Sequence, residues 1–300
     1  MPEKQTLEIR WHGRGGQGIV TAAKMPAEVI IKQNGHALAS QEYGPERSGA
    51  PIKCYTTISN TEIKMYSQPE HPDIVIVVDS TLLKTEPILE GTNENAIIIV
   101  NSSHEPENIA RAISGGKRKV WTVDATAIAL QELGKNFPNT TLLGALIRAT
   151  ELVSLENILE KVAEGLGKKN AALLEGNLQA VRRGYNEARF YQGSEDAVPS
   201  TPAPPQKAWY EIEEAGTLPA GTAKKYSTGD WRITHPVLNE QCVHCMLCWL
   251  FCPDNAIVVK NEKVIGFDPE HCKGCGICAE VCPPKIRAIA MEEGGEPCEK

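Results

Sequence analysis

Two copies of one cysteine pattern near the C-terminus constrain this chain more than any other sequence feature. Of its ten cysteines, eight lie between Cys242 and Cys282. The segments NEQCVHCMLCWLFCPDNAI and DPEHCKGCGICAEVCPPKI align cysteine for cysteine, and both contain the pattern C-x2-C-x2-C-x3-C-P. A secreted disulfide scaffold would instead spread its cysteines across the fold. The repeat therefore predicts two structurally equivalent halves that each present four thiolates.

The spacing within each copy is that of a two-cluster bacterial ferredoxin. Two residues between cysteines let one tight loop direct three thiolates to one face of a cubane. The fourth cysteine of the run points away and reaches the other cluster. With every corner filled by protein, such clusters relay single electrons and bind no substrate at iron. We expect Cys242, Cys245, Cys248 and Cys282 to bind the first 4Fe–4S cluster, and Cys272, Cys275, Cys278 and Cys252 to bind the second.

Two other interpretations of the cysteines are weaker. A structural zinc site needs only four ligands, usually two C-x2-C pairs, and leaves the third and fourth cysteine of each run unexplained. Disulfides would have to form in a chain whose first residues are charged where a secretory signal is apolar. Cys54 lies in an apolar strand pattern and Cys298 in a polar tail, so we expect neither to bind a cluster.

The first 192 residues carry the pattern of an α/β open sheet. The runs DIVIVVD and NAIIIVN are apolar with polar ends, as in parallel strands covered on both faces. Pro26 predicts a kink or a break in the first helix, and Gly35 is placed as the residue that ends it. Strands alternating with helices predict a parallel or mixed sheet. The expected strands are 7–11, 36–40, 52–58, 73–79, 96–101 and 120–124, and the expected helices are 17–34, 125–134, 139–153, 154–165 and 168–191.

Proline and glycine separate this part from the cysteine repeat. Four prolines fall between Pro199 and Pro205, and few apolar residues accompany them. Proline fixes the backbone and removes donors, so an extended connector is expected there. The predicted organisation is an α/β domain at 1–192, a connector at 193–236 and an α+β ferredoxin domain at 237–300.

A glycine loop follows the first predicted strand. Gly13, Gly15 and Gly18 form G-x-G-x-x-G between a strand and a helix, the context of a dinucleotide-binding fingerprint. Backbone amides at such a helix start suit an anion. A dinucleotide site also needs an acidic residue at the end of the second strand, where only Glu42 is available. The glycines are also explained by close packing of the helix on the sheet, so both interpretations stay open.

The overall charge excludes some classes of partner. The chain has 31 Lys and Arg residues against 38 Asp and Glu residues, a formal net charge of −7. Such a chain offers no extended basic surface for nucleic acid or an anionic membrane. Its apolar runs are all shorter than the ~18 residues of a membrane span. We therefore expect a cytoplasmic protein without a nucleic-acid or membrane partner.

The order of the N-terminal motifs resembles a known family. The segments GRGGQG, QEYGPERSGAP, PDIVIVVD and NTTLLGAL together resemble the gamma subunit of the thiamine-diphosphate-dependent 2-oxoacid:ferredoxin oxidoreductases. The segment 237–297 is similar to the delta subunit of that family, a two-cluster ferredoxin. One position departs from the family pattern, because Arg47-Ser48-Gly49 stands where Arg-Gly-Gly is usual.

The resemblance implies a fused gamma–delta subunit of the EC 1.2.7 type that is not catalytic alone. Alpha- and beta-type partner subunits would hold thiamine diphosphate and magnesium and cleave the carbon–carbon bond next to a carbonyl. Electrons would leave through the two clusters to an external ferredoxin. Pyruvate is the commonest substrate of the family. Oxalate is the alternative, because an oxalate-oxidising member is also built around such a fused chain.

The resemblance also implies a role for the glycine loop. In members that use coenzyme A, the gamma domain is associated with coenzyme A access. Its phosphates would meet the amides between Gly15 and Gly18, and Arg47 would assist or would form an ordinary structural ion pair. The candidate binding residues are Gly13, Gly15, Gly16, Gly18 and Arg47.

Two further functions stay open. If the glycine loop binds a dinucleotide, the chain is an NAD(P)H- or flavin-linked reductase module with a ferredoxin tail. Alternatively, the chain is a binding or assembly subunit whose clusters are structural. Bleaching of the clusters by NADH would favour the reductase. Reversible reduction followed by transfer to added ferredoxin would argue against the assembly subunit.

Overall fold

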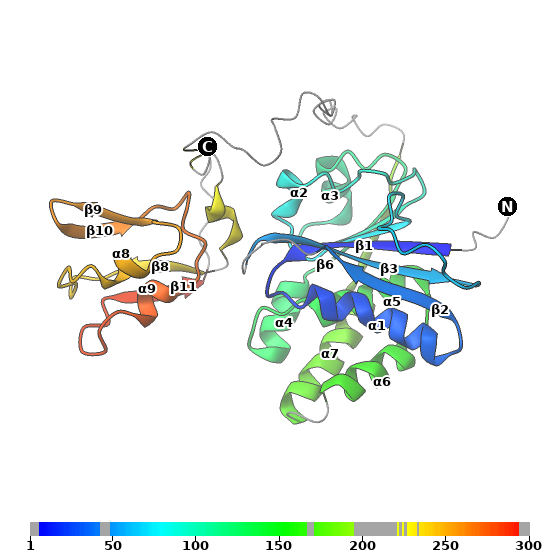
Figure 1. The fold of residues 1–300 in the computed structure, drawn as a ribbon. Coiled ribbons are helices and arrows are strands. Elements are labelled where there is room, and N and C mark those ends of the chain that lie inside the picture. Colours follow the sequence, from blue (N-terminus) through cyan, green and yellow to red (C-terminus); the bar gives the residue numbers. More distant parts are fainter. Residues whose placement is uncertain are drawn as a thin grey trace. The chain divides into compact units, whose positions relative to one another are not determined.

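The chain divides into two compact units. One unit is formed by Met1–Glu46 and Pro51–Pro205, and the other by Arg47–Ala50 and Gln206–Lys300. Figure 1 shows the elements of each unit, which are described separately below. The computed structural model of the chain describes residues 6–42, 49–166, 171–194, 227–232 and 234–293, together with Gly221 and Lys224.

Seven strands form one mixed sheet in the described part of the first unit (Figure 1). They are β1 (Thr6–Arg14), β2 (His36–Gln41), β3 (Pro51–Ser59), β4 (Ile74–Val77), β5 (Ile97–Asn101), β6 (Lys119–Val123) and β7 (Arg189–Gln192). Their order is β2-β3-β1-β4-β5-β6-β7. The strands β1, β4, β5 and β6 are parallel neighbours, and every pair that includes β2, β3 or β7 is antiparallel. The predicted open α/β sheet is confirmed in its mixed form.

Helices cover both faces of this sheet (Figure 1). One face carries α1 (Ile19–Lys32), α4 (Ala125–Leu133), α5 (Asn139–Thr150), α6 (Leu155–Leu166) and α7 (Ala171–Glu187). The other carries α2 (Leu82–Thr85) and α3 (Pro106–Ala112). These last two helices were not predicted from the sequence, because each is too short to show a helical period. In the described ranges, no helix combines the length and apolar character needed to span a membrane.

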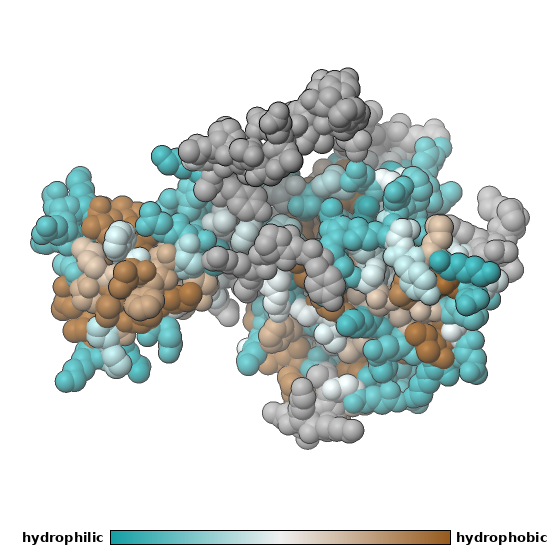
Figure 2. Space-filling view, viewed as in Figure 1, coloured by the Kyte–Doolittle hydropathy of each residue, from teal (hydrophilic) through white to brown (hydrophobic). Residues whose placement is uncertain are grey.

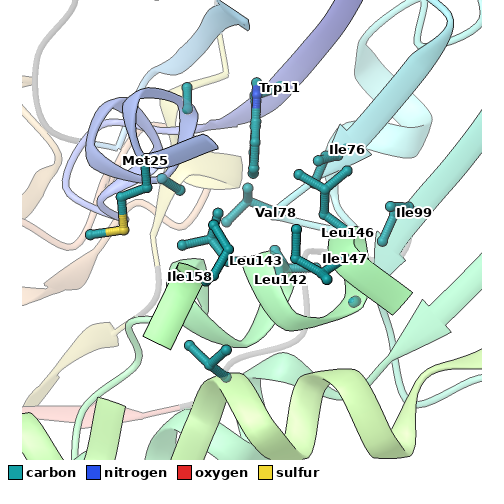
Figure 3. Packing of buried hydrophobic residues seen from close by; sticks show 14 of the residues in the cluster. Trp11, Met25, Ile76, Val78, Ile99, Leu142, Leu143, Leu146, Ile147 and Ile158 are labelled. Carbon is teal, nitrogen blue, oxygen red and sulfur yellow. The ribbon is translucent and has the colours of Figure 1, made fainter. Parts of the chain in front are cut away.

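The larger core cluster lies between the sheet and its thicker helical layer (Figure 3). Trp11, in β1, is fully buried there, and its Nε1 donates to Oγ1 of Thr56 at 3.0 Å. That hydroxyl donates in turn to the carbonyl of Ala23 in α1 at 2.6 Å. The indole therefore adds its apolar area to the core without leaving its polar atom unpaired.

The end of α1 differs from the prediction. Asn34, with φ of 63°, takes the left-handed position expected for Gly35. The amide of Gly35 donates to the carbonyl of Ile30 at 2.9 Å and the amide of Asn34 to that of Ile31 at 3.0 Å, the paired bonds of a Schellman motif. Asparagine visits this backbone region readily, so glycine is not required there. The helix also continues through Pro26, so the predicted break is absent.

The helix predicted over 168–191 is wrong at its C-terminal end. α7 stops at Glu187, and Arg189–Gln192 forms β7, which pairs with β6. Phe190 packs on Trp121, with ring centroids 4.9 Å apart. Without β7, β6 would be an edge strand with unpaired backbone groups. The segment RFYQ has the aromatic residues that favour a strand, so it pairs there and does not extend the helix.

The described part of the second unit contains two strand pairs and two short α-helices. Its strands are β8 (Thr234–Leu238), β9 (Ile257–Lys260), β10 (Lys263–Phe267) and β11 (Ile289–Glu293), and its helices are α8 (Leu247–Phe251) and α9 (Ile277–Glu280). β8 pairs with β11 and β9 with β10, both antiparallel. Exchanging the two halves of the cysteine repeat maps one pair onto the other. The halves are therefore structurally equivalent, as the repeat predicts.

The second unit begins before residue 237. Thr228–Trp231 forms a 3-10 helix, and the amide of Gly229 donates to the carbonyl of Glu270 at 2.7 Å. A Cβ atom at Gly229 would lie 2.1 Å from the carbonyl oxygen of Pro269, so this contact requires glycine. These residues lie in the range expected for the connector, but they pack against the cysteine repeat because its loop offers backbone acceptors. Most of that range falls outside the described residues.

Candidate metal centres and glycine loop

The two cysteine loops have the same backbone conformation. In the first loop, His244 and Met246 are left-handed, with φ of 54° and 64°. In the second, the equivalent residues are Gly274 and Gly276, with φ of 70° and 78°. Alternation between right- and left-handed residues turns successive amides to one side and creates a concave nest for an anionic group. α8 begins after Met246 and α9 after Gly276, so the equivalence extends into the helices.

Equivalent cysteines are also equally exposed. Cys245 and Cys275 are exposed, whereas Cys248 and Cys278 are buried. The remaining cysteines of the repeat have intermediate exposure and are Cys242, Cys252, Cys272 and Cys282. The two halves of the repeat thus present the same arrangement of thiols.

Each half contains a cavity whose wall includes four cysteines. No three His, Cys, Asp or Glu side chains in the described ranges gather around a point that one metal ion could occupy. Three cysteines of each cavity come from one motif and the fourth from the other, which is the arrangement that crossed ligation would need. Cys242, Cys245, Cys248 and Cys282 line the first cavity, and Cys252, Cys272, Cys275 and Cys278 line the second.

The crossing cysteines accept backbone hydrogen bonds. The amide of Ala256 donates to Sγ of Cys252 at 3.2 Å, and the amide of Ala288 donates to Sγ of Cys282 at 3.2 Å. Burial raises the pKa of the Cys278 thiol to about 12. Metal ligation needs thiolates, so bound iron would have to supply the positive charge that stabilises them. The donor set and its amides fit an iron–sulfur cluster.

The glycine loop lies at the carboxyl end of β1. Gly16 and Gly18 have left-handed backbones, with φ of 98° and 73°. A Cβ atom at Gly13 would lie 3.0 Å from Cδ1 of Ile19, and one at Gly18 would lie 2.7 Å from Nδ2 of Asn139. The left-handed turn therefore favours glycine at Gly16 and Gly18, whereas Gly13 allows α1 to pack closely on the end of β1.

The polar residues of the glycine loop are bound to the end of β4. Oδ2 of Asp79 accepts from Nε of Arg14 at 3.1 Å and from Nε2 of Gln17 at 3.0 Å. Oγ1 of Thr81 accepts from Nη2 of Arg14 at 2.7 Å. The Arg14 side chain is only 2% exposed, so its guanidinium holds the loop and does not face solvent. The segments GRGGQG and PDIVIVVD thus meet at one edge of the sheet.

The strand order contradicts the dinucleotide-binding interpretation of this loop. In a dinucleotide-binding βαβ unit, the first two strands are parallel neighbours. Here β3 lies between β1 and β2. Glu42, the acidic residue after β2, accepts a hydrogen bond from Oη of Tyr55 at 2.7 Å. Arg47, the cationic candidate for this site, lies outside the described residues.

Comparisons with known proteins assign both parts of the chain. The family model of the pyruvate ferredoxin/flavodoxin oxidoreductases matches residues 8–187, more than half of the chain. The chain belongs to the pyruvate ferredoxin/flavodoxin oxidoreductase family. A second family model, the 4Fe-4S dicluster domain, matches residues 236–291. This member of the oxidoreductase family therefore carries an iron–sulfur domain in the same polypeptide.

Relatives within the oxidoreductase family cover the first unit. The pyruvate synthase subunit PorC of Thermotoga maritima is 42% identical over 187 residues, which are 62% of this chain and 96% of that protein. The common gamma subunit of the pyruvate/ketoisovalerate oxidoreductases of Thermococcus kodakarensis is 38% identical over 186 residues, 62% of this chain and 99% of that protein. The crystal structure of the Thermotoga maritima pyruvate oxidoreductase subunit PorC matches with 38% identity and a TM-score of 0.56, and covers 63% of this chain and 100% of that one. The resemblance to a gamma subunit is confirmed.

The NTTLLGAL motif of this oxidoreductase subunit serves helix packing. A Cβ atom at Gly144 in α5 would lie 2.0 Å from the carbonyl oxygen of Val181 in α7. A Cβ atom at Gly184 in α7 would lie 2.0 Å from the carbonyl oxygen of Thr141 in α5. The two helix backbones therefore touch through a reciprocal pair of glycines, which sequence reasoning did not foresee.

Sequence reasoning also missed buried polar residues on β1 of the oxidoreductase fold. Arg10 and His12 are 6% and 1% exposed. Nη2 of Arg10 donates to the carbonyls of Ile88 and Glu90 at 2.9 and 2.7 Å, whereas Nε2 of His12 has no partner among the described residues. Burial, with the cations Arg10 and Lys53, lowers the pKa of His12 to about 3. No local signal marks this burial, because segments elsewhere in the sequence cover both faces of β1.

α8 exposes a row of apolar side chains. Trp249, Leu250 and Phe251 are 48%, 66% and 53% exposed. At the positions equivalent to the first two, α9 has Ala279 and Glu280. Figure 2 shows hydrophobic residues gathered on the surface of this unit. The two equivalent halves of the iron–sulfur domain therefore present different surfaces.

Proposed function

We propose that this chain is the electron-relay subunit of a thiamine-diphosphate-dependent 2-oxoacid:ferredoxin oxidoreductase. The observation that carries the proposal is the pair of cavities, each with four cysteines drawn from both motifs, in a chain that also has the gamma-type unit. When bound, a 4Fe–4S cluster accepts and releases one electron. The protein contributes the ligands and the amide donors, and it leaves no iron corner open to a substrate. Thiolate ligands persist in reducing compartments, which supports a cytoplasmic location.

The ligand sets that we propose are crossed between the motifs. Cys242, Cys245, Cys248 and Cys282 would bind one cluster, and Cys252, Cys272, Cys275 and Cys278 the other. The chain purified under anaerobic conditions should contain about eight irons, the number that eight cysteine ligands predict. A content of about four irons, or of zinc alone, would overturn this part of the proposal.

Alpha- and beta-type catalytic subunits would hold thiamine diphosphate and magnesium and would supply the electrons. Relatives of the first unit are subunits of pyruvate synthase by name, which supports a multi-subunit enzyme. Three consecutive large apolar residues on α8 support a permanent partner, because permanent interfaces are more apolar than transient redox encounters. An external ferredoxin would then accept the electrons.

The partner surface can be tested without touching a cysteine. The double variant Leu250→Gln and Phe251→Gln should lose the catalytic subunits during co-purification while keeping its iron. The matched control is Val258→Gln and Val259→Gln on β9, whose side chains are each 38% exposed. If both double variants keep the catalytic subunits, α8 is not the contact.

Pyruvate is the substrate that the relatives favour, and oxalate is the second candidate. An oxalate-oxidising family member is also built around such a fused chain. Ser48, where the family usually has glycine, is compatible with oxalate, because oxalate cleavage needs no coenzyme A. The deciding measurement is ferredoxin reduction by the co-purified complex with pyruvate, oxalate or 2-oxoglutarate, each with and without coenzyme A. Reduction by NADH alone would instead support the reductase interpretation, for which the strand order gives no basis.

We also propose that the amides of the glycine loop receive phosphates of coenzyme A, with Arg47 assisting. Gly15, Gly16 and Gly18 are partly or fully exposed at the start of α1, whereas Arg14 is committed to Asp79. Gly16→Ala should raise the KM for coenzyme A without changing the iron content. Gly134→Ala, also at a left-handed glycine with open space around it, is the control. Equal KM values in both variants would contradict this site.

A further inference from the structure

The second cavity is lined by an ion pair whose lysine is buried. Nζ of Lys273 lies 3.2 Å from Oδ2 of Asp254, and both residues line the cavity. Lys273 follows Cys272, and Asp254 comes shortly after Cys252, so the pair joins the two segments that supply cysteines to this cavity. The lysine side chain is 6% exposed and the aspartate side chain 20%. The ammonium group of Lys273 is therefore less solvated than the carboxylate of Asp254.

The first cavity has no such pair. The residues equivalent to Lys273 and Asp254 are Val243 and Pro284. Val243 is 58% exposed, and the described residues that line the first cavity carry no charged side chain. Two sites that are equivalent in their cysteines thus differ in fixed charge.

The two sites share their main backbone features. Both loops have left-handed residues at the same two positions, and each crossing cysteine accepts one amide hydrogen bond at 3.2 Å. One polar contact exists only at the first cavity, where Nδ1 of His244 lies 3.6 Å from Sγ of Cys242. At that length the contact is a weak one, whereas Lys273 contributes a full charge. The ion pair is the main electrostatic asymmetry.

We propose that Lys273 and Asp254 set the reduction potential of the cluster in the second cavity, and that Lys273 makes it the more easily reduced of the two. This inference rests on the crossed ligation proposed above. Reduction adds one negative charge inside the cavity. A buried ammonium is screened less than a partly exposed carboxylate, so the net effect of the pair stabilises the reduced form. Electrons would therefore collect at the second cavity, and the first would serve as their entrance.

The test is a redox titration of the full chain, followed by electron paramagnetic resonance. Lys273→Gln should shift the midpoint potential of one of the two cluster signals to more negative values. Asp254→Asn should shift the same signal to more positive values, and the double variant should lie between Lys273→Gln and the wild type. The scale expected for one buried charge is roughly a tenfold change in the ratio of reduced to oxidised cluster, about 59 mV for a one-electron couple. Lys263→Gln, at an exposed lysine on β10, is the control and should shift neither signal.

The opposite signs of the two shifts separate charge tuning from a structural role. Variants that keep their iron but show unchanged potentials, or that move the two signals together, would overturn the proposal. If Lys273→Gln, Lys273→Arg and Asp254→Asn all lose one cluster, the pair is needed for assembly and the tuning role is also overturned. A wild-type chain with fewer than two clusters would instead contradict the proposed function, and the iron content reports that outcome separately.

Discussion

The guanidinium of Arg14 donates to the carboxylate of Asp79 at 3.1 Å, and the arginine side chain is 2% exposed. This pair joins the ends of two parallel strands, β1 and β4, and fixes the loop between β1 and α1. An arginine in a glycine loop is commonly interpreted as a phosphate ligand. Here the pairing makes it a structural residue, and any anion at the loop must bind backbone amides or another cation.

Asp79→Ala should destabilise the first unit because it leaves a buried guanidinium without its counter-charge. Removing one partner of a buried pair costs about 3 kcal/mol. Urea unfolding of the full chain, followed by circular dichroism, measures the change. Glu107→Ala removes the partner of Arg111 in an exposed pair and should have little effect. Equal losses of stability in both variants would show that the Arg14–Asp79 pair contributes no more than an exposed ion pair.

Gly144→Ala should destabilise the first unit by about 3 kcal/mol, at the upper end of overpacking costs. The added Cβ atom would lie 2.0 Å from the carbonyl oxygen of Val181, and backbone on both sides resists the shift. Gly165→Ala is the matched control, because it lies in α6 with nothing within 4 Å of its Cβ position. That variant should gain roughly 0.5–1 kcal/mol from helix propensity. Thermal unfolding compares the two, and a stable Gly144→Ala would contradict the tight α5–α7 contact.

The elements of this fold were predictable where the apolar pattern is long and local. The pattern of 73–79 predicts a strand, and β4 occupies Ile74–Val77. The candidate clusters follow from cysteine spacing for the same reason, since three of four ligands lie in one short loop. The prediction failed where an element depends on pairing with a distant part of the sequence. β7 depends on the free edge of β6, a partner far away in the sequence.

The burial of polar side chains was the other failure of prediction. Lys273 has the sequence signature of an exposed residue, and only the folding of both halves brings Asp254 to it. His12 alternates with Trp11 and Gly13, as in a strand with one solvated face, yet it is 1% exposed. Pairing and coverage by distant segments decide such positions, and a local pattern does not contain that information.

His12 should make the first unit acid-sensitive. Its pKa is lowered from 6.5 to about 3, mainly by burial. Between those values the unfolded chain binds a proton that the folded chain does not, so stability falls as the pH drops below 6.5. The loss should reach about 2 kcal/mol at pH 5. Urea unfolding at pH 7 and pH 5 should show this loss in the wild type and a smaller one in His12→Gln. The control His36→Gln, at an exposed histidine, should keep the wild-type loss.

Gly274→Ala and Gly276→Ala should have different effects although both glycines are left-handed, with φ of 70° and 78°. Each substitution costs roughly 1–2 kcal/mol in backbone strain. The Cβ atom at Gly274 would also lie 2.1 Å from the carbonyl oxygen of Thr234 in β8, whereas the Cβ atom at Gly276 would meet nothing within 4 Å. The loop at Gly274 must therefore move away from β8, which displaces Cys272 and Cys275. Iron analysis and the EPR spectrum of the reduced chain should show the loss of about half the iron in Gly274→Ala and nearly full iron in Gly276→Ala. Equal iron in the two variants would mean that backbone conformation alone, and not the contact with β8, dictates glycine in this loop.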